Sequence, residues 1–96
     1  MTIPNYDYLR DPAEIYRQSF AAIRREVDLA ALTDDLAPVA LRLVHATAMP
    51  EILGDLFATP GAAQAGRDAL AQGVPILCDA EMVARGVTRN RLPQNN

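Results

Sequence analysis

The chain has 96 residues, half of them hydrophobic but only 5% aromatic, which fits at most one domain with a core of small aliphatic side chains. Nine basic and 12 acidic residues give a net charge of −3, which argues against non-specific binding to nucleic acid. The single cysteine, Cys78, excludes an internal disulfide and fits a reducing compartment. No apolar run approaches the roughly 18 residues of a membrane span, and no signal peptide is recognisable. We therefore expect a cytoplasmic protein without membrane contact.

The first predicted helix runs from about Pro12 to Glu26, after an extended opening segment. Asp11 supplies an N-cap acid, Pro12 fits the first helical position, and Glu14 stands where a capping box has its glutamate. Apolar side chains then recur at helical spacing at Tyr16, Phe20, Ile23 and Val27.

A second helix is predicted to follow a cap at Thr33-Asp34-Asp35 and to end near Met49-Pro50, because the residue before a proline is disfavoured in a helix. Pro38 is tolerated there because it lies early in the helix. The residues expected on the apolar stripe of this helix are Leu36, Val39, Ala40, Leu43, Val44 and Thr47.

Two further helical segments are predicted in the next part of the chain. A short turn is expected through residues 51–56. Thr59-Pro60 then resembles a cap followed by a proline and predicts an alanine-rich helix that runs to about Gln72 and stops at Gly73.

Val74–Cys78 is a short apolar run bounded by glycine and proline, and it predicts a strand. Asp79 is expected to cap a last helix over residues 80–85, with an aperiodic polar segment after it. A strand that is apolar on both faces and followed by a helix is typical of a parallel sheet. The predicted fold class is therefore α/β: the helix-rich N-terminal part of a parallel-sheet domain, with about four helices and one clear strand near 74–78. The strands that pair with it would come from a longer chain or from another polypeptide.

His45 is the only histidine, and an imidazole is the side chain best suited to acid–base chemistry near neutral pH. At about 100° per residue, it is predicted to lie on the side of its helix opposite Leu36 and Leu43, away from the apolar stripe. Arg42 lies three residues earlier and is a helical neighbour. A structural role for His45 is the alternative.

Several stretches of the chain, in order along it, resemble the N-terminal half of the precorrin-8X methylmutase family. They are Tyr6-Asp7-Tyr8, Arg10-Asp11, Ile15-Tyr16, Ser19-Phe20, Ile23-Arg24, Arg42–Ala46, Pro60-Gly61, Pro75–Ala80, Met82–Ala84 and Gly86–Arg89. Because the family is roughly twice as long, residues 1–96 are expected to be the N-terminal part of a single, incomplete domain.

The resemblance implies a homodimeric α/β isomerase of cobalamin biosynthesis, with active sites near the subunit interface. Its substrate would be precorrin-8X or the cobalt form, and a methyl group would move from C-11 to C-12 to give hydrogenobyrinic acid. His45 would be the catalytic acid–base group, Ser19 and Arg42 would bind substrate, and Thr88 would lie close to it. No metal or organic cofactor is expected.

Other interpretations of these residues remain open. Arg42 is equally compatible with a solvated helix position, Thr88 with a loop, and Ser19 with a bond to a carbonyl one turn back. The chain as a whole is also compatible with a non-catalytic half-domain that binds a tetrapyrrole or a protein. One departure stands out, since the family usually has alanine, cysteine and glycine where this chain has Ala46-Thr47-Ala48. A methyl group at position 48 would crowd whatever approaches that glycine closely.

Overall fold

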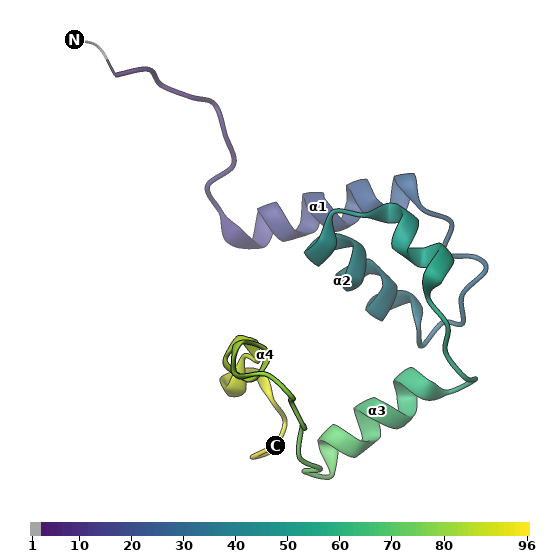
Figure 1. Ribbon diagram of the computed structural model, residues 1–96. Helices are drawn as coiled ribbons and strands as arrows, with labels where there is room; N and C mark the ends of the chain where they lie inside the picture. Colours follow the sequence, from purple (N-terminus) through teal and green to yellow (C-terminus); the bar gives the residue numbers. More distant parts are fainter. Residues whose placement is uncertain (1–2) are drawn as a thin grey trace. The chain divides into compact units, whose positions relative to one another are not determined.

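The computed structural model describes residues 3–96, which form helices joined by turns and irregular segments (Figure 1). The chain divides into two units, Met1–Phe57 and Ala58–Asn96, and each is described by itself. The elements in chain order are α1 (Pro12–Glu26), α2 (Ala37–Thr47), the 3₁₀ helix η1 (Pro50–Asp55), α3 (Ala62–Ala71), α4 (Glu81–Gly86) and the 3₁₀ helix η2 (Arg89–Arg91).

Helix α1 has the predicted bounds. The Asp11 side chain accepts a hydrogen bond from the Ala13 amide at 3.3 Å, which confirms the predicted N-cap. In the first turns, hydrogen bonds from Arg17 and then Gln18 lower the pKa of Glu14 from 4.5 to about 2.

Helix α2 begins at Ala37 and ends at Thr47, close to the predicted end. Its C-cap is Ala48, which adopts the left-handed conformation with φ 54° and ψ 28°. Among residues 3–96, Ala48 is the only non-glycine residue with a positive φ. Its amide donates to the Val44 carbonyl at 2.8 Å, so the last turn closes at a backbone geometry that glycine adopts more easily.

The core of the first unit forms where α1 packs beside α2. Ile23, Leu41 and Val44 are its buried cluster, with exposures of 9%, 5% and 2%. The predicted apolar stripe on α2 was partly wrong, because Leu41 is buried although it was not assigned to the stripe. Val39, which was assigned to it, is 39% exposed. Apolar side chains from α1, from the segment after it and from η1 pack against the cluster: Phe20, Val27, Leu29, Ile52 and Leu53.

In the second unit, α3 starts two residues after the predicted Thr59-Pro60 signal and ends at Ala71. The Asn96 side-chain amide donates to the carbonyl oxygens of Leu70 at 3.0 Å and Val74 at 2.8 Å. These two bonds attach Asn96 to the end of α3 and to the segment that follows it.

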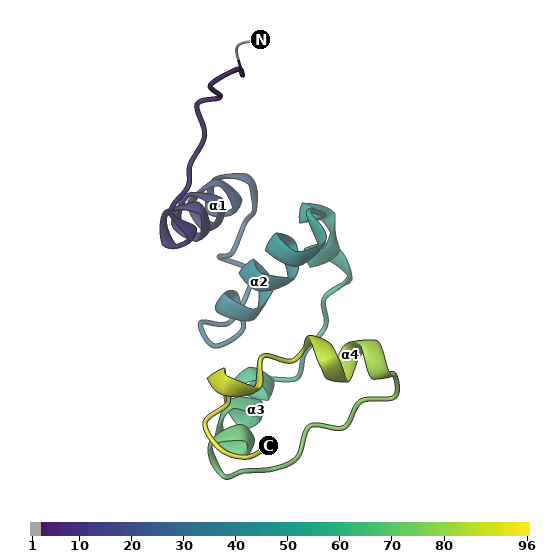
Figure 2. The same ribbon diagram turned by 90° about the vertical axis from the view of Figure 1, so that its left-hand side faces the viewer.

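The predicted strand at 74–78 is wrong, and so is the α/β fold class built on it. Residues 3–96 contain helices but no strand. Figure 2 shows the segment between α3 and α4 as an extended trace without a pairing neighbour. In this segment the Val74 amide donates to the Ala69 carbonyl at 3.1 Å, and the Ile76 amide donates to the Asn96 carbonyl at 3.3 Å. These two hydrogen bonds do not form the ladder of a sheet. An apolar run becomes a strand only where another strand pairs with it.

Helix α4 is also capped differently from the prediction. It begins at Glu81, and its N-cap is Ala80, which makes no side-chain capping bond. The predicted cap at Asp79 is therefore wrong. The following segment, predicted to be aperiodic, contains the short turn η2.

Within residues 3–96, no helix is long and apolar enough to cross a membrane. The same residues contain no group of three or more histidine, cysteine, aspartate or glutamate side chains arranged to hold a metal ion.

Candidate active site

A hydrogen bond between Ser19 and His45 joins the two main helices of the first unit. Ser19 comes from α1 and His45 from α2, and the serine Oγ lies 2.8 Å from the imidazole Nδ1. Both side chains are half-buried. Ser19 therefore bonds across to the next helix, and the alternative of a bond to a carbonyl one turn back is not what the structure shows. Two of the predicted site residues are thus in direct contact.

Two aromatic rings from α1 also contact the imidazole. The ring centroids of Tyr16 and Phe20 lie 5.1 Å and 5.0 Å from that of His45, with interplanar angles of 30° and 39°. Tyr16, Ser19 and Phe20 are spaced so that they share one face of α1. These rings were expected on an apolar stripe, and their contact with the histidine was not predicted. Their spacing around Ser19 was the signal that could have indicated it.

His45 lies nearer the core than the sequence analysis predicted. It follows Leu41 by four residues, so it shares the edge of the face that α2 packs against α1. The prediction placed it on the opposite side because it centred the apolar stripe on Leu36 and Leu43. The histidine is at once part of the packed interface and bound to a polar partner.

The bond to Ser19 determines which ring nitrogen of His45 is available. If Nδ1 carries the proton, it donates to the serine oxygen, and Nε2 presents a lone pair. If the serine hydroxyl donates to Nδ1 instead, Nε2 carries the proton. Nε2 has no hydrogen-bond partner within residues 3–96 in either case. This nitrogen is therefore the position at which His45 can exchange a proton with a ligand.

Arg42 is exposed and lies beside this group. Its guanidinium carbon is 5.8 Å from the centroid of Phe20, a ring that also contacts His45. Arg42 makes no ion pair with any residue in the described part of the chain. A guanidinium without an acidic partner is free to bind a ligand carboxylate through two parallel hydrogen bonds.

A hollow of about 270 Å³ opens next to the hydrogen-bonded pair. Glu26 supplies the one acidic side chain in its lining. Ala48, the left-handed residue where the resemblance predicts a glycine, also lines it, so the extra methyl group borders this hollow. The lining residues are Ser19, Ala22, Ile23, Glu26, Val44, His45, Ala48 and Pro50.

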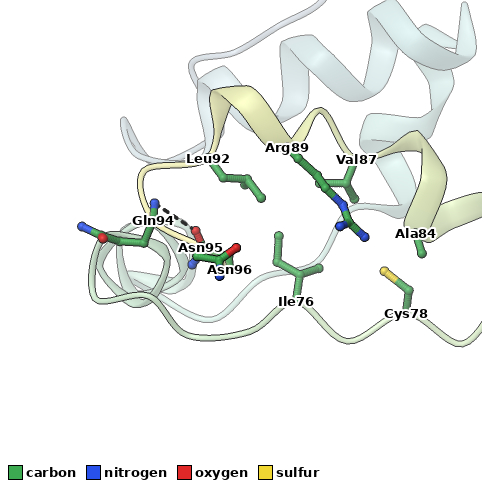
Figure 3. Close-up of a pocket in the computed structure, with 9 residues that line it drawn as sticks. All are labelled: Ile76, Cys78, Ala84, Val87, Arg89, Leu92, Gln94, Asn95 and Asn96. Atoms are coloured by element: carbon green, nitrogen blue, oxygen red, sulfur yellow. Dashed lines mark hydrogen bonds between the residues drawn. The ribbon is translucent and has the colours of Figure 1, made fainter.

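Thr88, the remaining predicted site residue, belongs to the second unit, where it precedes η2 and its carbonyl accepts a bond from the Arg91 amide at 3.0 Å. The next residue, Arg89, lines a separate hollow of about 300 Å³. Figure 3 shows the Arg89 side chain directed toward Ile76 and Cys78. Cys78 is half-buried rather than enclosed in a core.

The histidine with one anchored and one available nitrogen, next to an unpaired arginine, has the features of an acid–base centre for an anionic substrate. Residues 14–96 match the precorrin-8X methylmutase family. The chain belongs to this family.

Three relatives give the extent of the similarity. The precorrin-8X methylmutase of Pseudomonas aeruginosa is 57% identical over 90 residues, which is 94% of this chain and 43% of that protein. The precorrin-8X methylmutase of a Sinorhizobium species is 49% identical over 94 residues, or 98% of this chain and 45% of that protein. The cobalt-precorrin-8 methylmutase of Priestia megaterium is 30% identical over 84 residues, which is 88% of this chain and 37% of that protein. The chain spans less than half the length of these relatives.

Proposed function

We propose that this chain supplies the acid–base residue, His45, of a precorrin-8X methylmutase, which moves a methyl group from C-11 to C-12 of precorrin-8X to give hydrogenobyrinic acid. The observation that supports this most directly is the 2.8 Å bond between Ser19 and His45, which leaves Nε2 as the exchangeable position. Membership of the family supports the reaction class.

In the proposed reaction, the bond from the methyl carbon to C-11 breaks and its bond to C-12 forms. His45 Nε2 exchanges a proton with the macrocycle during this shift. Because the reaction is an isomerisation, the proton is returned and no co-reactant is consumed. Besides its hydrogen bond with Nδ1, the hydroxyl of Ser19 can make a further hydrogen bond, and we propose that this second bond is to the substrate.

Arg42 is proposed to hold the substrate through one of the acetate or propionate groups at the edge of the macrocycle. Its lack of an ion-pair partner within residues 3–96 supports this role. Thr88 is proposed to lie close to the substrate in the complete protein. Positioning of the ring by these contacts would supply much of the rate enhancement.

The test is a chimera, because the chain spans less than half of its relatives. Its 90 matching residues replace the corresponding part of the Pseudomonas aeruginosa methylmutase, and the absorption spectrum is followed after addition of precorrin-8X. We expect conversion to hydrogenobyrinic acid by the chimera and none by its His45→Ala variant. Conversion that survives in His45→Ala would refute the catalytic role. The 96-residue chain is measured beside it, and binding without conversion in both proteins would favour a tetrapyrrole-binding module.

The role of Arg42 is tested in the same chimera. Arg42→Gln should raise KM, because it removes the cation that pairs with the substrate carboxylate. Arg67→Gln is the matched control, since Arg67 is an exposed arginine on α3 without an ion pair to any described residue. Equal KM values for the two variants would contradict the assignment.

We also propose the cobalt-free substrate, a homo-oligomeric assembly and a cytoplasmic location. The two relatives with the higher identities are named for precorrin-8X, and the 30% identical relative is named for the cobalt form. Large apolar side chains such as Leu77, Phe57 and Met82 are 93%, 89% and 85% exposed, which supports further burial by more chain or by another subunit. Turnover of both substrates and the molar mass of the chimera by light scattering test the first two proposals.

A further inference from the structure

We propose that Tyr16 and Phe20 are positioning residues for His45, holding the plane of its imidazole so that Nδ1 stays bonded to Ser19 and Nε2 stays available. This inference rests on the proposed function for the role of His45. It adds two residues that act on the histidine rather than on the substrate.

The distances support a direct contact of both rings with the imidazole. Tyr16 and Phe20 lie 5.1 Å and 5.0 Å from it, centroid to centroid, within the range of about 4.5–7 Å that is typical of interacting aromatic rings. The two rings are also in contact with each other, at 6.0 Å. The imidazole therefore packs against a pair of rings from one helix face.

The hydrogen bond by itself constrains the position of one atom. Because a hydrogen bond tolerates a range of lengths and angles, an imidazole held only at Nδ1 could still rock about its side-chain torsions, and Nε2 would move with it. The rings of Tyr16 and Phe20 are tilted by 30° and 39° to the imidazole and restrict this rotation. Since the serine and both rings belong to neighbouring turns of α1, the three contacts form one rigid support.

Core packing does not account for the position of Tyr16. Its side chain is 49% exposed, and it is not part of the cluster of Ile23, Leu41 and Val44 or of the side chains packed against that cluster. Within residues 3–96, the Tyr16 ring contacts the rings of His45 and Phe20. Phe20 does pack against the cluster, so Tyr16 is the more discriminating residue to replace.

The experiment uses the fact that His45 is the only histidine, so histidine labelled with ¹⁵N and ¹³C reports on this ring alone. Spectra of the 96-residue chain are recorded at a pH where the imidazole is neutral, because the nitrogen shifts then identify the tautomer and its hydrogen bond. Ser19→Ala defines the signals of the unbonded ring. Tyr16→Leu and Phe20→Leu are compared with Tyr16→Phe and Phe20→Tyr.

We expect each leucine variant to move the Nδ1 signal toward its position in Ser19→Ala and to remove the ring-current shift of the imidazole protons. The aromatic replacements should keep the wild-type signals, because the ring and not the hydroxyl makes the contact. Phe57→Leu is the control, since Phe57 is 89% exposed and its ring does not contact His45. Methyl signals of Leu41 and Val44 verify that the core remains intact.

Unchanged imidazole signals in Tyr16→Leu would overturn the proposal, and so would an equal change in Phe57→Leu. The measurement needs no substrate, so its result is independent of whether the chimera is an active methylmutase. If the chimera is active, Tyr16→Leu should lower kcat while KM stays unchanged, whereas Tyr16→Phe should restore kcat.

Discussion

Replacing Ala48 with glycine should stabilise the first unit, although the change removes a side chain. Ala48 closes α2 at φ 54° and ψ 28°, in the left-handed region. That conformation costs a residue with a Cβ about 1–2 kcal/mol relative to the right-handed helix. Glycine avoids this cost, but it loses more backbone freedom on folding, which lowers the free energy of unfolding by about 0.5–1 kcal/mol. The difference predicts a net stabilisation of about 0.5–1 kcal/mol, since the exposed methyl group contributes little burial.

The measurement is the free energy of unfolding from urea titrations followed by circular dichroism. Ala46→Gly is the matched control, because Ala46 is an exposed alanine two residues earlier in the right-handed part of α2. There glycine should destabilise the protein by about 1 kcal/mol. The two substitutions are therefore expected to change the free energy of unfolding in opposite directions, although they lie at the end of the same helix. If the free energy of unfolding of Ala48→Gly is equal to or lower than that of the unchanged protein, the argument from backbone strain is refuted.

Asn96→Ala should speed amide hydrogen exchange at the C-terminal end of α3, because two bonds to backbone carbonyls are lost at a cost of about 1 kcal/mol each, whereas Asn95→Ala should leave exchange unchanged. Arg17→Gln should raise the pKa of Glu14 from about 2 toward 4.5 in a ¹³C titration of the carboxyl group, since the hydrogen bond from Arg17 is the main cause of the lowering. The stabilisation from this carboxylate is present above pH 4.5 and disappears as the pH falls toward 2, and the variant should lose most of it, since only the bond from Gln18 remains. Leu41→Ala should cost about 3 kcal/mol in urea unfolding, because Leu41 is 5% exposed and leaves a cavity.

The elements that the sequence predicted well are those with local signals. For α1, the acid at Asp11 and the proline after it act on the backbone next to them, and the helix has the predicted bounds. The segment at 74–78 failed because pairing depends on residues elsewhere, which the composition of five residues does not describe. The face of α2 was misjudged for a similar reason, since burial of Leu41 depends on where α1 packs.

The resemblance named candidate site residues but did not predict how their side chains are arranged. The resemblance named Ser19 and His45 without indicating that their side chains touch, and the geometry adds that they are 2.8 Å apart. Tyr16 was missed because an aromatic residue at helical spacing is usually a core residue. Thr88 stays a prediction, because it belongs to the other unit.

The pairing of Ser19 with His45 limits how this protein can be recombined with its relatives. Because α2 carries His45 and α1 carries the residues that contact its ring, neither helix can form this arrangement alone. A crossover placed between Glu26 and Ala37 would combine His45 from one parent with Ser19 from another, and a mismatch of about 1 Å would lengthen their 2.8 Å contact beyond hydrogen-bonding distance. Crossovers outside Pro12–Thr47 take both helices, and with them the bond between Ser19 and His45, from one parent.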